Sequence, residues 1–300
     1  MLRAGFSLVE LLIVIVLLAV VLTSVMTIFV HQQRFYSDAA AIMETRSSTR
    51  DAAYVLQSDL RALSPKNGDI YAMGSKFVEF RAQPGSSVVC TIDGTRTVLT
   101  VPPLHVATGA ALTSWLAPPA WGDTLLIFDT DTIPGSGGNH WRTYTLTAAP
   151  AANGSCPNAT GLTTTSGEAS LGWTMNVTPA LTAGTLVGAP IRLMRRARFE
   201  LYQEASGNWY LGYYDCLPSR TPACGALQPV AGPYVPPNNG GTGGIVFTFL
   251  DATGTVTASK TLVRRVDLAA RAQTAVDIKT AGYKSGAMTD STFSSIAPRN

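Results

Sequence analysis

Glu10 is the only ionisable side chain in a 25-residue run, from Phe6 to Val30, that is otherwise apolar or hydroxyl-bearing. Such a run is long enough to cross a bilayer as a helix. A carboxylate buried in hydrocarbon is costly unless it is neutralised or paired, so an acid at this place is a candidate functional group. We therefore expect Glu10 to meet a cation.

The chemistry that fits Glu10 is a salt bridge to a newly formed chain terminus. A cut after Gly5 would leave Phe6 with a cationic amine, and Glu10 would lie about 6 Å further along the helix axis. An ammonium group at a helix N-terminus opposes the macrodipole, and the carboxylate of a neighbouring copy beside it would relieve both charges. The pattern favours assembly of many copies.

The sequence GFSLVELLIV, from Gly5 to Val14, carries a family resemblance. It resembles the class III signal of type IV pilins and type II secretion pseudopilins, which prepilin peptidase cuts after the glycine. The resemblance implies that residues 1–5 are a leader that stays in the cytoplasm, that Phe6 becomes N-methylated, and that Glu10 aids docking into a filament. Arg3 places a positive charge on the leader side, in agreement with the positive-inside tendency.

The same resemblance implies partners and a location. The partners are prepilin peptidase, other major and minor pilins or pseudopilins, and the inner-membrane assembly platform. The location is the bacterial inner membrane, crossed once, with the C-terminal domain in the periplasm, and then a pilus or pseudopilus, at its tip if the chain caps the filament.

The apolar segment also allows a secretory signal or a plain single-pass anchor. A secretory signal would have an apolar core of about 7–15 residues followed closely by a small-residue cleavage site. Here the run is longer, and the sequence Ala39-Ala40-Ala41 lies well beyond it. A plain single-pass anchor would need no glutamate near its start. Glu10 therefore favours the filament signal over both.

The helix is expected to continue past the membrane to Ser64. Small or apolar residues recur at spacings of three, four or seven, at Ile42, Thr49, Ala53, Leu56, Leu60 and Leu63. Polar residues fall between them, at Arg46, Arg50, Asp51, Gln57 and Arg61. Pro65 disfavours helical geometry at Ser64, so a helix from Phe6 would measure about 88 Å. Residues 6–30 would be its transmembrane half and residues 31–64 its amphipathic half.

Residues 66–300 are expected to form one extracytoplasmic β-rich domain. Charged residues make up 14% of the chain, well below the typical value of about 25%. Short strands separated by turn residues are predicted at Lys76–Ala82, Ser87–Asp93, Arg96–Val101, Thr124–Asp129, Trp141–Thr147, Ile191–Gln203, Trp209–Asp215, Gly244–Leu250 and Thr255–Gln273. The fold class is therefore α+β: a long N-terminal helix packed on a C-terminal antiparallel sheet. Pilins share this architecture.

Turn residues predict two hairpins and one long loop. Ser206–Asn208 and Asp251–Gly254 each contain a glycine that can adopt positive φ. The segment Leu217–Gly244 has six prolines and six glycines in 28 residues. It therefore predicts an irregular surface loop.

The four cysteines predict disulfides rather than a metal site. They lack the C-x-x-C spacing and belong to a chain that the N-terminal signal marks for export. Three pairings are possible. We favour Cys216 with Cys224, which closes a short loop worth about 2–3 kcal/mol, and by elimination Cys90 with Cys156. Four buried thiols are the alternative.

A second resemblance concerns the C-terminal part. Gly244–Gly254 followed by Val263–Leu268 is similar to the closing hairpin and strand of large minor pilins of the W type and of pseudopilin J, and Phe293–Asn300 is similar to the end of such minor pilins. Thr27 stands where many major pilins have a helix-bending proline. A body of about 235 residues is also bulky for a subunit stacked many times. These features imply a low-copy subunit that initiates or caps a filament.

Catalytic motifs are absent from the sequence. It contains no nucleophile elbow, phosphate loop or zinc-binding H-E-x-x-H, and His31, His105 and His140 are scattered. Asp129 and Asp131, with Asp123 nearby, do not follow the EF-hand pattern. We therefore expect the chain to have no enzymatic activity, no cofactor and no metal site.

A nucleic-acid or surface-binding module is the alternative function. Arg192, Arg196 and Arg198 would share one strand face, with Arg264, Arg265 and Arg271 as further candidates and with Trp209, Tyr210, Tyr213 and Tyr214 in the next strand. Basic residues beside aromatic ones can bind single-stranded nucleic acid. The formal net charge is only +3, which favours a solvated face over an aromatic core.

Overall fold

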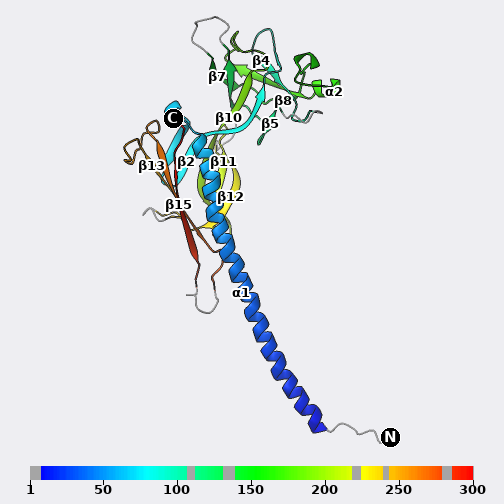
Figure 1. The fold of residues 1–300 in the computed structure, drawn as a ribbon, viewed down its shortest axis with the longest axis vertical. Helices are drawn as coiled ribbons and strands as arrows, with labels where there is room; N and C mark the ends of the chain where they lie inside the picture. The colour runs from blue at the N-terminus through cyan, green and yellow to red at the C-terminus, as the bar shows by residue number, and fades with distance from the viewer. Residues whose placement is uncertain are drawn as a thin grey trace, which may run out of the picture.

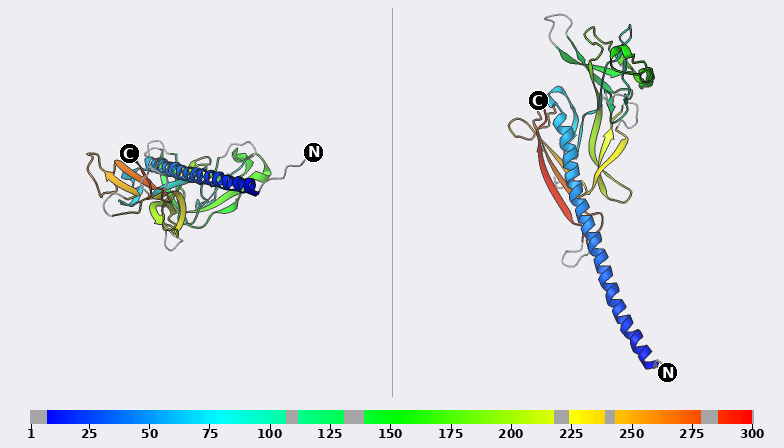
Figure 2. Two further views of the ribbon diagram at one scale, coloured as in Figure 1. Left: turned by 90° about the horizontal axis from the view of Figure 1, so that it is seen from below. Right: turned by 45° about the vertical axis from the view of Figure 1, so that its right-hand side comes forward.

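The computed structural model describes residues 8–106, 112–130, 139–217, 224–238, 243–278 and 286–299. One long helix, α1 (Leu8–Ala62), runs from the N-terminal end into a β-rich body (Figure 1). The first half of α1 projects from the body, and the second half lies against it (Figures 1 and 2). The α+β fold class expected from the sequence is therefore confirmed.

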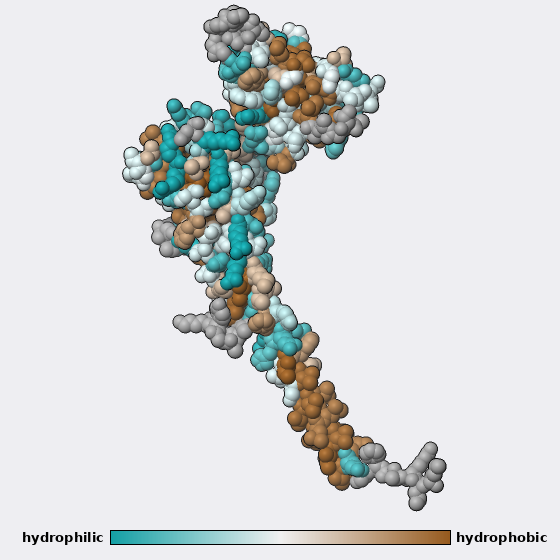
Figure 3. Space-filling view, in the orientation of Figure 1, coloured by the Kyte–Doolittle hydropathy of each residue, from teal (hydrophilic) through white to brown (hydrophobic). Residues whose placement is uncertain are grey.

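The first half of α1 is covered by no other part of the described chain. Its large apolar side chains from Leu8 to Phe29 are each at least 52% exposed. They form an apolar rod in the space-filling view (Figure 3). By length and composition, α1 is the one helix among the described residues that could cross a membrane.

The second half of α1 buries a stripe at helical spacing. Its buried residues include Thr45, Ser48, Thr49, Ala52, Leu56 and Leu60. The stripe expected from the sequence is thus correct at Thr49, Leu56 and Leu60 but wrong at Ala53, where Ala52 takes the buried place. Gln57, expected among the polar residues, is half-buried, and its amide donates a hydrogen bond to the Ser294 hydroxyl. Leu63, just after the helix, is buried in the core. The 3₁₀ turn η1 (Pro65–Asn67) follows, so the helix ends before Pro65, as the proline predicted.

The described part of the body contains fifteen strands, all paired antiparallel. Their bounds are β1 (Ile70–Gly74), β2 (Phe77–Val88), β3 (Thr91–Ile92), β4 (Val98–Val101), β5 (Ser114–Trp115), β6 (Thr124–Asp129), β7 (His140–Leu146), β8 (Ala151–Gly154), β9 (Gly172–Thr178), β10 (Pro190–Gln203), β11 (Trp209–Asp215), β12 (Ala226–Tyr234), β13 (Ile245–Leu250), β14 (Arg265–Gln273) and β15 (Thr289–Ile296). The main path runs β13-β14-β12-β11-β10-β6-β7-β9-β4-β3. Two short helices complete the body, η2 (Asn158–Thr160) and α2 (Ser166–Ala169).

The body has two separate apolar cores, which we call the helix core and the distal core. The helix core joins Ala52, Leu56 and Leu60 of α1 to strands on both sides of the helix, including β10, β12 and β14. Strands β15 and β12 lie on either side of α1 (Figures 1 and 2). The distal core, built from β4, β6, β7, β9 and the start of β10, contains no residue of α1. The expectation of a single domain stays a prediction.

Strand β10 passes through both cores. Its inward side chains at Ile191 and Leu193 belong to the distal core, and those at Ala197, Phe199 and Leu201 belong to the helix core. Arg195 occupies the inward position between the two groups. The junction of the two cores is therefore charged.

Several sequence expectations about the strands are corrected. The segment Leu217–Gly244, expected as a loop, contains β12, whose Tyr234 is fully buried and donates a hydrogen bond to the Ser48 carbonyl of α1 at 2.7 Å. Strand β12 tolerates its prolines because β14 pairs with it only at Tyr234. The expected strand Thr255–Gln273 begins only at Arg265. Six strands were missed altogether: β1, β5, β8, β9, β12 and β15.

Both disulfides favoured from the sequence are present. Cys90 bonds to Cys156 across a sequence separation of 66, with Cα atoms 5.5 Å apart. Cys216 bonds to Cys224, eight residues later, so this bridge links the end of β11 to the region just before β12. All four cysteines of the chain are thus paired.

Candidate functional site

The N-terminal turn of α1 carries the residue on which the functional hypothesis depends. Glu10 lies in that first turn and is exposed. A carboxylate at this place is favourable for the helix macrodipole. Gly5 and Phe6, the predicted processing and methylation residues, lie outside the described residues.

The hydroxyl side chains of the described apolar half, at Thr23, Ser24 and Thr27, donate hydrogen bonds within the helix. The Ser24 hydroxyl donates to the Val20 carbonyl at 3.0 Å, and the Thr27 hydroxyl donates to the Thr23 carbonyl at 2.8 Å. Hydroxyl groups bonded in this way can enter hydrocarbon without an external partner. Glu10 is the only ionisable side chain in this half, so it is the group whose charge hydrocarbon would penalise.

The comparisons with known proteins point to the same segment. Residues 1–26 match the prokaryotic N-terminal methylation motif. The match supports a type IV pilin-like protein. Such a motif implies processing by prepilin peptidase and assembly with other pilins, and the apolar half of α1 is consistent with anchoring in the inner membrane. No curated protein and no solved structure matches the chain.

The arginine face of β10 is the second candidate site. Arg192, Arg196 and Arg198 do share the outward face of this strand. Their guanidinium carbons lie over Trp141 at 4.4 Å, Tyr71 at 5.2 Å and Phe77 at 4.1 Å from the ring centroids, respectively. These partner rings come from β7, β1 and β2, so they are different aromatic residues from those expected.

Carboxylates neutralise much of this arginine face. Arg196 forms an ion pair with Glu79, and Arg198 is 2.8 Å from the Glu200 carboxylate. Of the expected aromatic residues, Tyr214 is the direct neighbour of Arg198 in the sheet register. Tyr213 instead packs edge-on against the buried Phe199. Two of the three arginines on this face are thus paired with carboxylates, which lowers its net positive charge.

The remaining arginines lie elsewhere. Arg265 and Arg271 belong to β14, which is separated from β10 by β12 and β11 in the sheet order. Arg265 is 3.1 Å from Asp267, and Arg271 lies over Phe293. Arg264 donates to the carbonyls of Thr261 and Val263. They therefore do not extend the arginine face of β10.

The acidic residues considered as metal ligands are engaged by arginines. Asp129 pairs with Arg142 and accepts a hydrogen bond from Thr182, and Asp123 pairs with Arg195. Asp131 lies outside the described residues. A cation would have to compete with a guanidinium at either described carboxylate.

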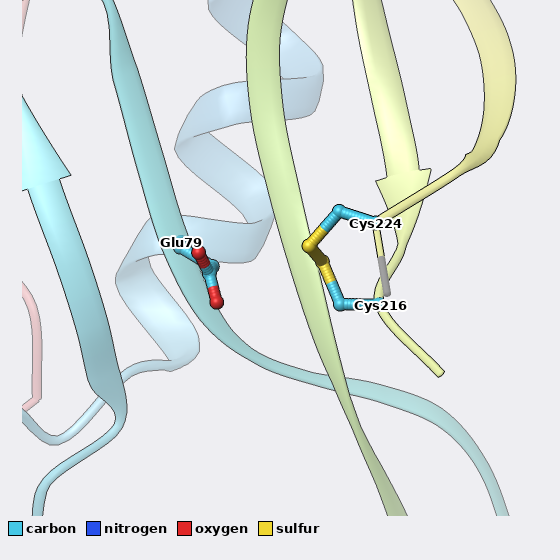
Figure 4. A group of neighbouring side chains, drawn as sticks. All are labelled: Glu79, Cys216 and Cys224. Carbon is cyan, nitrogen blue, oxygen red and sulfur yellow. A yellow bond between two sulfur atoms is a disulfide. The ribbon is translucent and has the colours of Figure 1, made fainter. Parts of the chain in front are cut away.

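Glu79 is close to the sulfur atoms of Cys216 and Cys224 (Figure 4), all within 4.8 Å of one another. These sulfur atoms are bonded to each other, so they provide no thiolate for a metal. The Glu79 carboxylate is held by Arg196. The three residues therefore provide a disulfide and a carboxylate that is already paired with an arginine.

Arg195 was not among the candidate residues predicted from the sequence. It is 4% exposed and binds Asp123 bidentately, with Nε to Oδ1 at 2.9 Å and Nη2 to Oδ2 at 2.6 Å. Nη2 also donates to the Pro118 carbonyl at 2.7 Å. Burial would lower the pKa of this guanidinium, but Asp123, with help from Asp215, raises it overall. Arg195 is thus a fixed buried cation at the junction of the two cores.

A sequence signal for Arg195 existed. It has the same parity as Ile191, Leu193 and Ala197, which point inward in a strand of period two. An arginine in phase with buried residues requires a buried acid. What the sequence could not supply was the identity of that acid, 72 positions away.

Proposed function

We propose that this chain is a minor pilin or pseudopilin, a structural subunit that starts or caps the assembly of a type IV pilus or a type II secretion pseudopilus. The observation that carries the proposal is the methylation motif at residues 1–26, joined to a helix whose first half is covered by no other described part of the chain.

In this proposal the chain has four parts: a leader, a membrane segment, a second helix segment beyond the membrane, and a body. Residues 1–5 form the leader and are removed by prepilin peptidase after Gly5. Phe6 becomes the N-methylated terminus, residues 6–30 lie in the inner membrane, and residues 31–64 lie beyond it. Residues 66–300 form the periplasmic body, which the filament later carries.

The shape of the body favours a low-copy position. The distal core lies beyond the end of α1, and its strands extend away from the helix axis (Figure 1). A subunit with such an extension is hard to stack repeatedly around a thin helical core but is easily accommodated at a tip. The similarity of the C-terminal strands to large minor pilins points the same way.

A module for binding DNA or a surface is less well supported. The carboxylates of Glu79 and Glu200 offset the charge of Arg196 and Arg198. Binding to a phosphate backbone relies on cations that release counterions. A structural role therefore explains the outward face of β10 with fewer assumptions.

The role of Glu10 provides the experiment. Glu10→Ala is expected to leave membrane insertion and cleavage after Gly5 intact, because neither needs the carboxylate, and to lower recovery in sheared filaments at least tenfold. Glu10→Asp keeps the charge and should retain part of the recovery. Leu11→Ala, an apolar change at the next position, is the matched control. Equal recovery of Glu10→Ala and Leu11→Ala would contradict the proposed assembly role.

A further inference from the structure

A cavity of about 280 Å³ lies between the last turns of α1 and the sheet. Val55 and Asp59 of α1 line one side, and Phe199 of β10 with Tyr213 and Asp215 of β11 line the other. Leu116, which is 89% exposed, also borders the cavity. The cavity therefore opens to the outside at the place where the two cores meet.

Asp59 is the chemically unusual group of this cavity. Its carboxylate has no hydrogen bond or ion pair with any residue in the described ranges. Burial raises its pKa from 3.8 to about 6. A carboxylate in such surroundings gains strongly from a cation brought beside it.

The surrounding charges leave the cavity negative. Arg195 is bound bidentately by Asp123, and the distance from its Nη1 to the Asp215 carboxylate is a longer 3.6 Å. Asp59, Tyr213 and Asp215 line the same cavity, and the pKa of Tyr213 is raised by burial and then by the charges of Asp215 and Asp59. Asp123 and Asp215 therefore share the charge of Arg195, and Asp59 adds a further carboxylate that has no ion pair with it, so the group carries two net negative charges when all are ionised.

Apart from Gln83 and Gln228, the rest of the lining is apolar. Phe199 belongs to the helix core, Val55 packs against that core, and the Tyr213 ring meets Phe199 edge-on with 5.3 Å between centroids. A ligand with an alkyl stem and a cationic end satisfies both parts of the lining. The volume lies just below the range of about 300–1,000 Å³ typical of small-molecule sites. One side chain of this kind would fit inside it.

We propose that the cavity is a docking site for a lysine side chain of a neighbouring filament subunit, with its ammonium group on Asp59 and its stem against Val55 and Phe199. This inference rests on the proposed function, because the occupant comes from another subunit. The compact ammonium group suits the cavity better than a planar guanidinium, which needs a wider fork of acceptors.

The first test needs no filament. The purified full-length chain in detergent, with ¹³C-labelled tyrosine side chains, is titrated with N-acetyl-lysine methylamide at pH 7.5. We expect a saturable shift of the Tyr213 resonances that N-acetyl-norleucine methylamide, of nearly the same shape but uncharged, does not produce. Asp59→Asn should weaken binding at least fivefold. Asp51→Asn, at an exposed aspartate of the same helix, should leave binding unchanged.

The second test identifies the occupant in cells that assemble the filament. A photo-crosslinking phenylalanine at Leu116 is expected to capture a filament subunit within a few residues of a lysine. Asp59→Lys should lower the yield of this crosslink at least tenfold, and changing that lysine of the partner to Asp should restore it.

The outcomes separate this inference from the proposed function. Crosslinking that is indifferent to Asp59, in a chain that still enters filaments, overturns the docking site alone. Binding of the lysine amide without any subunit crosslink assigns the cavity to small amines and overturns the subunit docking. A chain that never enters filaments contradicts the proposed function itself.

Discussion

The two halves of α1 form one continuous helix but have opposite surroundings. The first half exposes every large apolar side chain from Leu8 to Phe29, whereas the second half buries a stripe that includes Ala52, Leu56 and Leu60. The more apolar half is the uncovered one. Side chains of α1 are therefore buried only where the sheet packs against the helix. The apolar first half needs lipid or other chains to cover it.

Each half also contains a carboxylate for which we propose a function. Glu10 lies in the uncovered half and Asp59 in the packed half. We propose that both carboxylates meet cations from outside this chain, an amino terminus for Glu10 and a lysine for Asp59. Three substitutions can measure how far the two halves differ.

The largest effect is expected from truncating the packed stripe. Leu56 is fully buried, so Leu56→Ala should lower the free energy of unfolding by about 2–5 kcal/mol through lost burial and a cavity. Leu17→Ala, at a side chain that is 60% exposed in the uncovered half, should change it by less than about 0.5 kcal/mol. Denaturant unfolding of the full-length chain in detergent measures both. Similar losses for the two variants would remove the distinction between the halves.

An effect of intermediate size is expected at Asp59, where a substitution should raise the free energy of unfolding rather than lower it. Its pKa is about 6 when folded and 3.8 ordinarily, so the folded state holds the proton more tightly, and stability falls as pH rises from 4 to 6. Above that range the penalty is complete. Asp59→Asn should remove this dependence and stabilise the chain at pH 7 by about 1–2 kcal/mol, discounted from the full shift because Asp59 is only partly buried. If the free energies of unfolding of variant and wild type changed equally between pH 4 and 7, this would argue against a buried carboxylate at Asp59.

The smallest effect is expected at the contact of β12 with α1. The fully buried Tyr234 hydroxyl donates to the Ser48 carbonyl, and Tyr234→Phe deletes only that bond, at a cost of about 1 kcal/mol. Hydrogen exchange should show faster opening of β12 while the apolar half of α1 is unaffected. Tyr54→Phe, at a tyrosine of α1 that is 76% exposed, is the control. A loss no larger than this control would mean that β12 is held to α1 by other contacts.

Local patterns predicted much of the fold. Pro65 marked the end of α1, the glycine in Ser206–Asn208 marked the turn between β10 and β11, and period-two runs located much of the sheet. Strands β12 and β15 were missed for physical reasons. The first contains two prolines, and the second is almost entirely polar, so each is a strand because of its neighbours rather than its composition.

The candidate sites divide in the same way. Glu10 was evident from the sequence because an acid in an apolar run is locally anomalous. Asp59 was not evident, because one polar residue in an amphipathic helix is ordinary. Only the folding of β10 and β11 over this part of α1 places Asp59 beside Phe199 and Asp215. Contacts between residues so far apart in the sequence leave no local pattern.

The mass of the N-terminal peptide of the mature chain, isolated from membranes, tests the filament role most directly. We predict a chain that begins at Phe6 and carries one methyl group on its amino nitrogen. A mature chain that begins at Met1, or after Ala41, would contradict this role, because Glu10 would then have no newly formed amine to meet.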